Sequence, residues 1–202
     1  MSKRGHFEEI KSIEGLIFFA PLENGNTKDL VSGQELVPQK GTVTWDNNKD
    51  AYRFYGPTSK SMSYYIGSWN NLNMDLDITN AGFTYLFEVN APIYPICPII
   101  FGGRQWAHNL LSGSFYPTYN VFGKFAISLE PYSGTTHYSR YYYNGVLKNT
   151  IDRGNTPTVF SALAKQRVEI DTNNTSHTWW MRNAMIFNRS LTQDEIIEIQ
   201  GI

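Results

Sequence analysis

Two segments of the chain combine aromatic rings with hydrogen-bonding side chains, which is the chemistry that binds sugars. Sugar rings present apolar C–H faces that stack on Trp and Tyr, while Asn, Asp and Arg orient the hydroxyl groups. The first segment, residues 68–77, contains Trp69, Asn71 and Asp75. The second segment, residues 102–120, contains Arg104, Trp106, His108, Tyr116 and Tyr119. Any single ring has the alternative of packing in the core or in a subunit interface, so the larger cluster in the second segment makes it the stronger candidate.

Histidine and cysteine give no comparable pattern. The four histidines, His6, His108, His137 and His177, are far apart and lack the spacing of zinc ligands, which favours ordinary polar roles. The single cysteine, Cys97, excludes an internal disulfide. It lies in the apolar run YPICPII, with no local feature that would activate the thiol, and is predicted to be buried and inert.

The sequence predicts strands along almost the whole chain, and these strands must position the candidate residues. Short runs rich in aromatic and β-branched residues are bounded by Gly, Pro or Asn. The predicted strands are 15–22, 51–56, 63–67, 82–92, 125–131, 140–150, 165–173 and 177–188. Within 140–150, the pair Asn144-Gly145 between tyrosines and Val-Leu predicts a type I′ hairpin turn. This order predicts an all-β protein, a two-sheet antiparallel sandwich.

Composition sets the limits of that prediction. Aromatic residues make up 15% of the 202 residues, and a chain of this length commonly forms one sandwich domain. We expect residues 1–12 to be an N-terminal tail and residues 13–202 to form a single domain. The net charge of −1 argues against binding to nucleic acid or an anionic membrane. The chain shows no signal peptide and no run long enough to span a bilayer.

One short helix is predicted at the end of the chain, in NRSLTQDEIIEIQ. Thr192 and Glu195 have the spacing of a capping box, and Leu191 with Ile196 fits a hydrophobic staple. Ile196 and Ile199 belong to an apolar stripe for docking, and Gly201 is suited to end the helix in the left-handed conformation. A helix of about two turns is marginal alone, so it must be held against the sandwich.

The order of these stretches resembles the concanavalin A-like lectin/glucanase superfamily, in particular laminin-G-like jelly rolls. The resemblance covers residues 14–200 and is carried by GLIFFAPL, a strand that starts with Phe-Thr, the YYYNGVL hairpin and the closing NRSLTQDEI. The last stretch is the most specific. The chain departs from the family before it, because Trp179-Trp180 and Arg182-Asn183 stand where a glycine and an acidic pair are usual.

The resemblance implies a non-catalytic carbohydrate-binding or adhesion module on an extracellular surface. Its partners would be a glycan or cell-surface polysaccharide. By the same analogy calcium is a candidate cofactor, with Asp29, Asp46 and Asp75 as ligands in Asn-rich turns, although turns favour these residue types anyway.

Enzymes of the superfamily place their carboxylates as Glu-x-Asp-x-x-Glu, because retaining cleavage needs a nucleophile and an acid on one face. Glu169 and Asp171 match, but Asn174 stands in place of the second glutamate, so no enzyme is predicted. The alternative function is a structural or decoration protein, or a fibre, of a virion. Such a protein would use the same jelly roll for assembly with other subunits or copies, or for attachment to a host surface.

Overall fold

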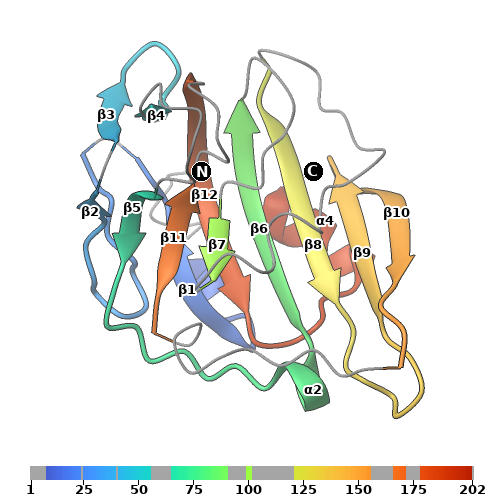
Figure 1. Ribbon diagram of the computed structural model, residues 1–202. Coiled ribbons are helices and arrows are strands. Elements are labelled where there is room, and N and C mark those ends of the chain that lie inside the picture. Colours follow the sequence, from blue (N-terminus) through green and yellow to red (C-terminus); the bar gives the residue numbers. More distant parts are fainter. Residues whose placement is uncertain are drawn as a thin grey trace, which may run out of the picture.

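The protein is a sandwich of two antiparallel sheets, seen here in a computed structural model that describes residues 8–23, 25–39, 41–55, 65–90, 99–101, 121–155, 166–171 and 178–201. The larger sheet has eight strands in the order β10-β9-β8-β6-β12-β4-β3, with β1 also paired to β12. The smaller sheet has four strands in the order β2-β5-β11-β7. Figure 1 shows β5, β11 and β7 in front of the larger sheet and the helix α4 behind it. The predicted fold class is confirmed.

The strands of the larger sheet are β1 (Leu16–Ala20), β3 (Thr42–Asp46), β4 (Ala51–Tyr55), β6 (Phe83–Asn90), β8 (Gly123–Leu129), β9 (Tyr138–Tyr143), β10 (Val146–Asp152) and β12 (Thr178–Phe187). The strands of the smaller sheet are β2 (Val37–Pro38), β5 (Tyr65–Trp69), β7 (Ile99–Phe101) and β11 (Val168–Asp171). The helices include α2 (Ile78–Ala81) and α4 (Gln193–Gln200). Strands β2, β3 and β7 and helix α2 are not among the predicted elements. None of the described helices is long and apolar enough to cross a bilayer.

The main core lies between the two sheets and is rich in aromatic rings. Alternate residues of β6 point inward, and Tyr85 stacks against Phe83 and Phe87 at centroid distances of 6.1 and 5.4 Å. Phe87 in turn stacks on Phe125 of β8 at 5.3 Å. Because successive side chains of a strand point to opposite faces, the residues between these rings point to the other side of the sheet.

A second apolar cluster covers part of that outer face of the larger sheet. Ile196 and Ile199 of α4 are 0% and 2% exposed and pack in this cluster with Leu86 of β6. The predicted docking of the helix through these two residues is confirmed. Ile10 is 2% exposed in the same cluster, so the stretch predicted as a tail contributes to the core.

The predicted turn chemistry is present. The capping box of Thr192 and Glu195 is complete, and Gly201 ends α4 with a φ of 60°. Asn144 and Gly145 have φ values of 47° and 74°, and Tyr143 pairs with Val146 across them. Both central residues with positive φ are what a type I′ hairpin requires.

Candidate functional site

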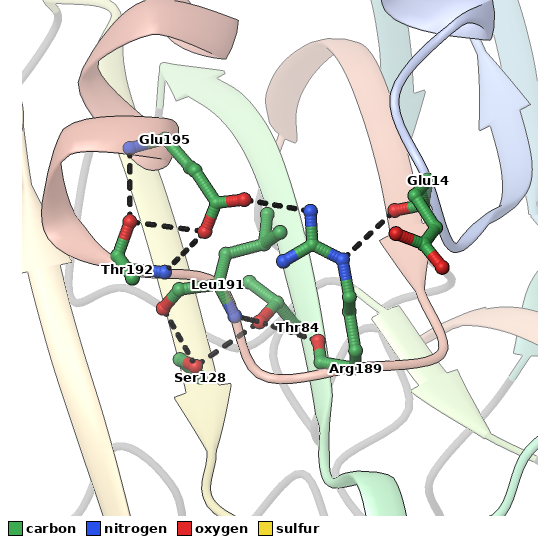
Figure 2. Close-up of polar contacts among 7 residues, drawn as sticks. All are labelled: Glu14, Thr84, Ser128, Arg189, Leu191, Thr192 and Glu195. Carbon is green, nitrogen blue, oxygen red and sulfur yellow. Dashed lines mark hydrogen bonds and ion pairs between the residues drawn. The ribbon is translucent and has the colours of Figure 1, made fainter.

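The C-terminal motif is fixed to the sandwich by a small network of hydroxyl groups, shown in Figure 2. The Thr84 hydroxyl of β6 accepts a hydrogen bond from the Leu191 amide at 2.8 Å and lies 3.0 Å from the Arg189 carbonyl. Ser128 of β8 lies 3.0 Å from the same hydroxyl and 2.7 Å from the hydroxyl of Ser190. These contacts provide hydrogen-bond partners for the backbone amide and carbonyl groups between β12 and α4, where the chain leaves the sheet.

Arg189 links this motif to the N-terminal part of the chain. Its Nε donates to the Glu14 carbonyl at 2.9 Å, and its Nη2 lies 2.6 Å from Glu195 Oε1 (Figure 2). The hydrogen bond from Arg189 is the largest cause that lowers the pKa of Glu195 to about 2, with help from Thr192 and against the effect of burial. The arginine is therefore held in place by two segments far apart in the sequence.

A polar pocket of about 350 Å³ opens beside this arginine. Its lining residues come from three segments of the chain and are Glu14, Gly15, Asp75, Asp77, Ala81, Asn188 and Arg189. The Asn188 amide donates to the Gly15 carbonyl at 2.8 Å, which joins two sides of the pocket. Gly15 has a φ of +89°, and a Cβ added there would lie 2.8 Å from Asn188 Oδ1. This position in the pocket wall therefore favours glycine over any other residue.

The carboxylates of the pocket differ in their hydrogen bonds and in their exposure to solvent. Asp77 accepts from the Asn80 amide at 3.2 Å and from its side-chain nitrogen at 2.8 Å, so it also caps α2. The Asp75 and Glu14 side chains are exposed. Three carboxylates against one guanidinium make the lining acidic, which suits a ligand that is neutral or carries amine groups.

The first predicted sugar-binding segment is only partly placed as expected. Trp69 is fully buried, its Nε1 donates to the Thr27 carbonyl at 2.7 Å, and its ring packs edge-on against Phe18 at 5.1 Å. The predicted stacking role of Trp69 is wrong, because a ring in the core cannot contact a sugar. Asn71 is exposed and has a φ of 57°, and Asp75 reaches the pocket.

The second predicted segment, with Arg104, Trp106, His108, Tyr116 and Tyr119, lies outside the described residues. Cys97 and Asn174 lie outside them as well.

Two of the three predicted calcium ligands serve turns instead. The buried Asp29 carboxylate accepts from the amides of Phe19 at 2.8 Å and Ser32 at 3.0 Å. Asp46 accepts from Trp180 Nε1 at 2.8 Å, the main cause that lowers the pKa of this aspartate. In the described parts of the chain, no three His, Cys, Asp or Glu side chains are arranged to hold a metal. Asp29, Asp46 and Asp75 therefore do not form one calcium site.

The carboxylate that leads the enzyme-like stretch is also engaged. Glu169 of β11 is 2% exposed, and its Oε1 lies 2.5 Å from Nε of Arg167. A carboxylate buried against an arginine is not available to a substrate.

Sequence reasoning missed the pocket because its walls are distant in the chain. The NRSLTQDEI stretch predicts the end of the domain, but the same stretch also supplies Asn188 and Arg189 to the pocket. This stretch is the most specific motif of the sequence and could have drawn attention to these residues. Nothing in the sequence, however, places it beside Glu14 and Asp75.

Comparison with known proteins gives similarity of structure alone. No family model and no curated protein matches the sequence. The binding domain of botulinum neurotoxin DC, solved in complex with rat synaptotagmin II, matches with a TM-score of 0.63 and 15% identity over 93% of this chain and 51% of that chain. The receptor-binding domain of botulinum neurotoxin type G matches with a TM-score of 0.55 and 14% identity over 92% of this chain and 50% of that one.

The binding domain of paraclostridial mosquitocidal protein 1 matches with a TM-score of 0.55 and 12% identity over 92% of this chain and 51% of that chain. The chain thus spans about half the length of the solved chains it matches. These matches agree with the predicted two-sheet sandwich fold.

Proposed function

We propose that the protein is a non-catalytic recognition module that binds a glycan or a glycan-bearing receptor at an extracellular surface. The solved structures it resembles are named as binding or receptor-binding domains of toxins. A shared fold does not fix function, so the proposal depends on the pocket rather than on the fold. The virion alternative gains no support from these comparisons.

The observation that carries the proposal is the open polar pocket beside Arg189. Its volume of about 350 Å³ is at the small end of the usual range for ligand sites, which suits one sugar ring. The exposed carboxylates of Asp75 and Glu14 are acceptors for sugar hydroxyls, and Asn188 supplies both a donor and acceptors. The excess of carboxylates favours neutral or amino sugars over acidic ones at this pocket.

The aromatic segment 102–120 is proposed as a further contact for the same kind of ligand. Arg104, Trp106, His108, Tyr116 and Tyr119 combine stacking rings with polar groups. Calcium is not needed for the pocket as proposed.

The test is binding of neutral and amino sugars on a glycan array, followed by calorimetry with Asp75→Asn. This change keeps the size of the side chain but removes its charge, and we expect affinity to fall about tenfold, the cost of one charge-assisted hydrogen bond. Asp194→Asn is the matched control, because Asp194 is also an exposed aspartate but does not line the pocket. Failure of the native protein to bind any such sugar, or equal affinity in Asp75→Asn, would contradict the proposal.

A further inference from the structure

The outer face of the larger sheet carries an aromatic and basic surface beyond the part that α4 covers. Trp179 and Met181 of β12 point into the main core, so Trp180 between them points outward. On the neighbouring strand β4, Tyr52 and Phe54 point inward, and Arg53 points outward. Trp180 and Arg53 are directly paired across the two strands, so their side chains are neighbours on this face.

The Trp180 ring is held in one orientation. Its Nε1 donates to Asp46 Oδ2 at 2.8 Å, and the Lys49 ammonium lies 5.2 Å from the ring centre. The ring is partly exposed, in contrast to its neighbour Trp179, which is 4% exposed and stacks on Phe54 at 4.7 Å. A fixed, partly exposed indole is a platform that loses little conformational entropy when a ligand stacks on it.

The strand that carries the indole is also tied to its neighbours by side-chain contacts. Arg182 Nε lies 2.8 Å from Glu88 Oε2, Asn183 Nδ2 lies 2.8 Å from Glu88 Oε1, and the Arg182 guanidinium lies 4.4 Å from the Phe122 ring centre. Asn183 has a φ of 53° in the irregular stretch of β12 between Arg182 and Met185. Bulges and left-handed residues of this kind re-aim side chains and are frequent next to binding sites.

Near the indole, the described residues offer two cations to a ligand, Arg53 and Lys49. Arg53 is exposed and has no ion-pair partner among the described residues. The Lys49 ammonium lies over the Trp180 ring, and its charge helps to lower the pKa of Asp46. The Asp46 carboxylate is occupied by Trp180 and by the Asn48 amide at 3.0 Å. Asp50 is another exposed carboxylate of this region, and its Oδ2 lies 4.0 Å from Arg182 Nη1.

We propose that Trp180 and Arg53 form a second binding site, for a sugar that carries a carboxylate. The sugar ring would stack on the indole, and its carboxylate would meet the Arg53 guanidinium, which is suited to two parallel hydrogen bonds. Lys49 would move from the ring face to the ligand, since an exposed cation–π contact is weak. This site is independent of the pocket beside Arg189 and has the opposite charge preference.

The test compares each acidic sugar with its neutral counterpart. The probes are sialyllactose against lactose, and oligogalacturonate against its methyl ester, so that the two sources of a sugar carboxylate are measured separately. We expect at least one acidic probe to bind about tenfold more tightly than its neutral counterpart at low salt, with the difference shrinking as salt is raised.

Variants then assign the binding to this face. Arg53→Glu is expected to remove the preference for the acidic probe, and Arg53→Lys to keep part of it, because lysine keeps the charge but not the fork of donors. Lys148→Glu is the matched control, an exposed charge reversal on β10 of the same sheet. Trp180→Ala is expected to abolish binding, and Asp75→Asn to leave it unchanged.

Three outcomes would overturn the proposal: equal binding of acidic and neutral probes, no binding of either, or unchanged binding in Arg53→Glu. Loss of binding in Asp75→Asn would assign the acidic sugar to the pocket instead and would likewise reject this site. Since Arg53 is exposed, its variants are expected to fold normally, which a thermal melt checks directly.

Discussion

At the scale of single residues, a few hydrogen-bonding side chains determine how the chain ends. Thr192 accepts from the Glu195 amide at 3.3 Å, and the Thr192 amide donates to Glu195 Oε2 at 2.8 Å. Arg189 then binds the other oxygen of the same carboxylate. Local spacing was enough to predict the capping box, whereas the contact with Arg189 required the turn that brings the arginine back to the helix.

Replacing Thr192 with Ala should lower the free energy of unfolding by about 1 kcal/mol, the usual cost of losing an N-cap side chain. Urea titrations of the native protein and the variant measure this difference. Thr192→Ser keeps the hydroxyl and serves as the control. Equal midpoints for native protein and Thr192→Ala would mean that the box does not contribute to stability.

The same carboxylate predicts a dependence of stability on pH. The pKa of Glu195 is lowered from 4.5 to about 2 in the folded protein, mainly by the hydrogen bond from Arg189. A lowered folded pKa means that the stabilisation is fully present above about 4.5, the unfolded value, and is lost as the pH falls toward about 2. We expect Glu195→Gln to be less stable than the native protein at pH 7 and the difference to shrink at pH 3. A constant difference across this range would reject the assignment.

At the scale of elements, the sequence predicted regular strands and tight turns better than the roles of residues in irregular stretches. The Asn144-Gly145 turn and β12 follow from local pattern, because turn geometry and alternation are local properties. The segment around Trp69 is rich in Asn and looked exposed, yet the ring is needed to fill the core beside Phe18. Strand β3, with alternate exposed threonines at an edge of the sheet, gave too weak an apolar pattern to be predicted.

The β9-β10 hairpin gives a prediction at this scale. Gly145 has a φ of 74°, so Gly145→Ala should destabilise the protein by about 1–2 kcal/mol, the cost of placing a Cβ in the left-handed region. Asn144→Gly should cost less than Gly145→Ala, because glycine adopts the same conformation without strain, although the change removes the Oδ1 that accepts from the Lys124 amide at 2.9 Å. Thermal melts of both variants provide the comparison, and a fully stable Gly145→Ala would show that the turn is not type I′.

At the scale of the whole molecule, one sheet supports two apolar clusters, one on each face. The inner cluster holds Phe87 and Trp69, and the outer cluster holds Ile196. Strand β6 contributes to both, with Phe87 pointing inward and Leu86 outward. The pocket beside Arg189 also depends on this arrangement, since its walls come from segments that meet only in the folded sandwich. Contacts between segments that are distant in the sequence leave no local sequence pattern, which is why the fold was predictable and the pocket was not.

Because both clusters share β6, we expect the helix and the sandwich to unfold together. Ile196→Ala should cost about 2–5 kcal/mol, the usual range for emptying a buried aliphatic site. The loss should appear equally in far-UV circular dichroism and in the fluorescence of tryptophan, to which Trp69 and Trp179 of the inner cluster contribute. Ile197→Ala, one residue along the same helix but only partly buried, is the control and should cost less. If the tryptophan signal instead keeps its native midpoint in Ile196→Ala while the dichroism changes, α4 unfolds as a separate unit.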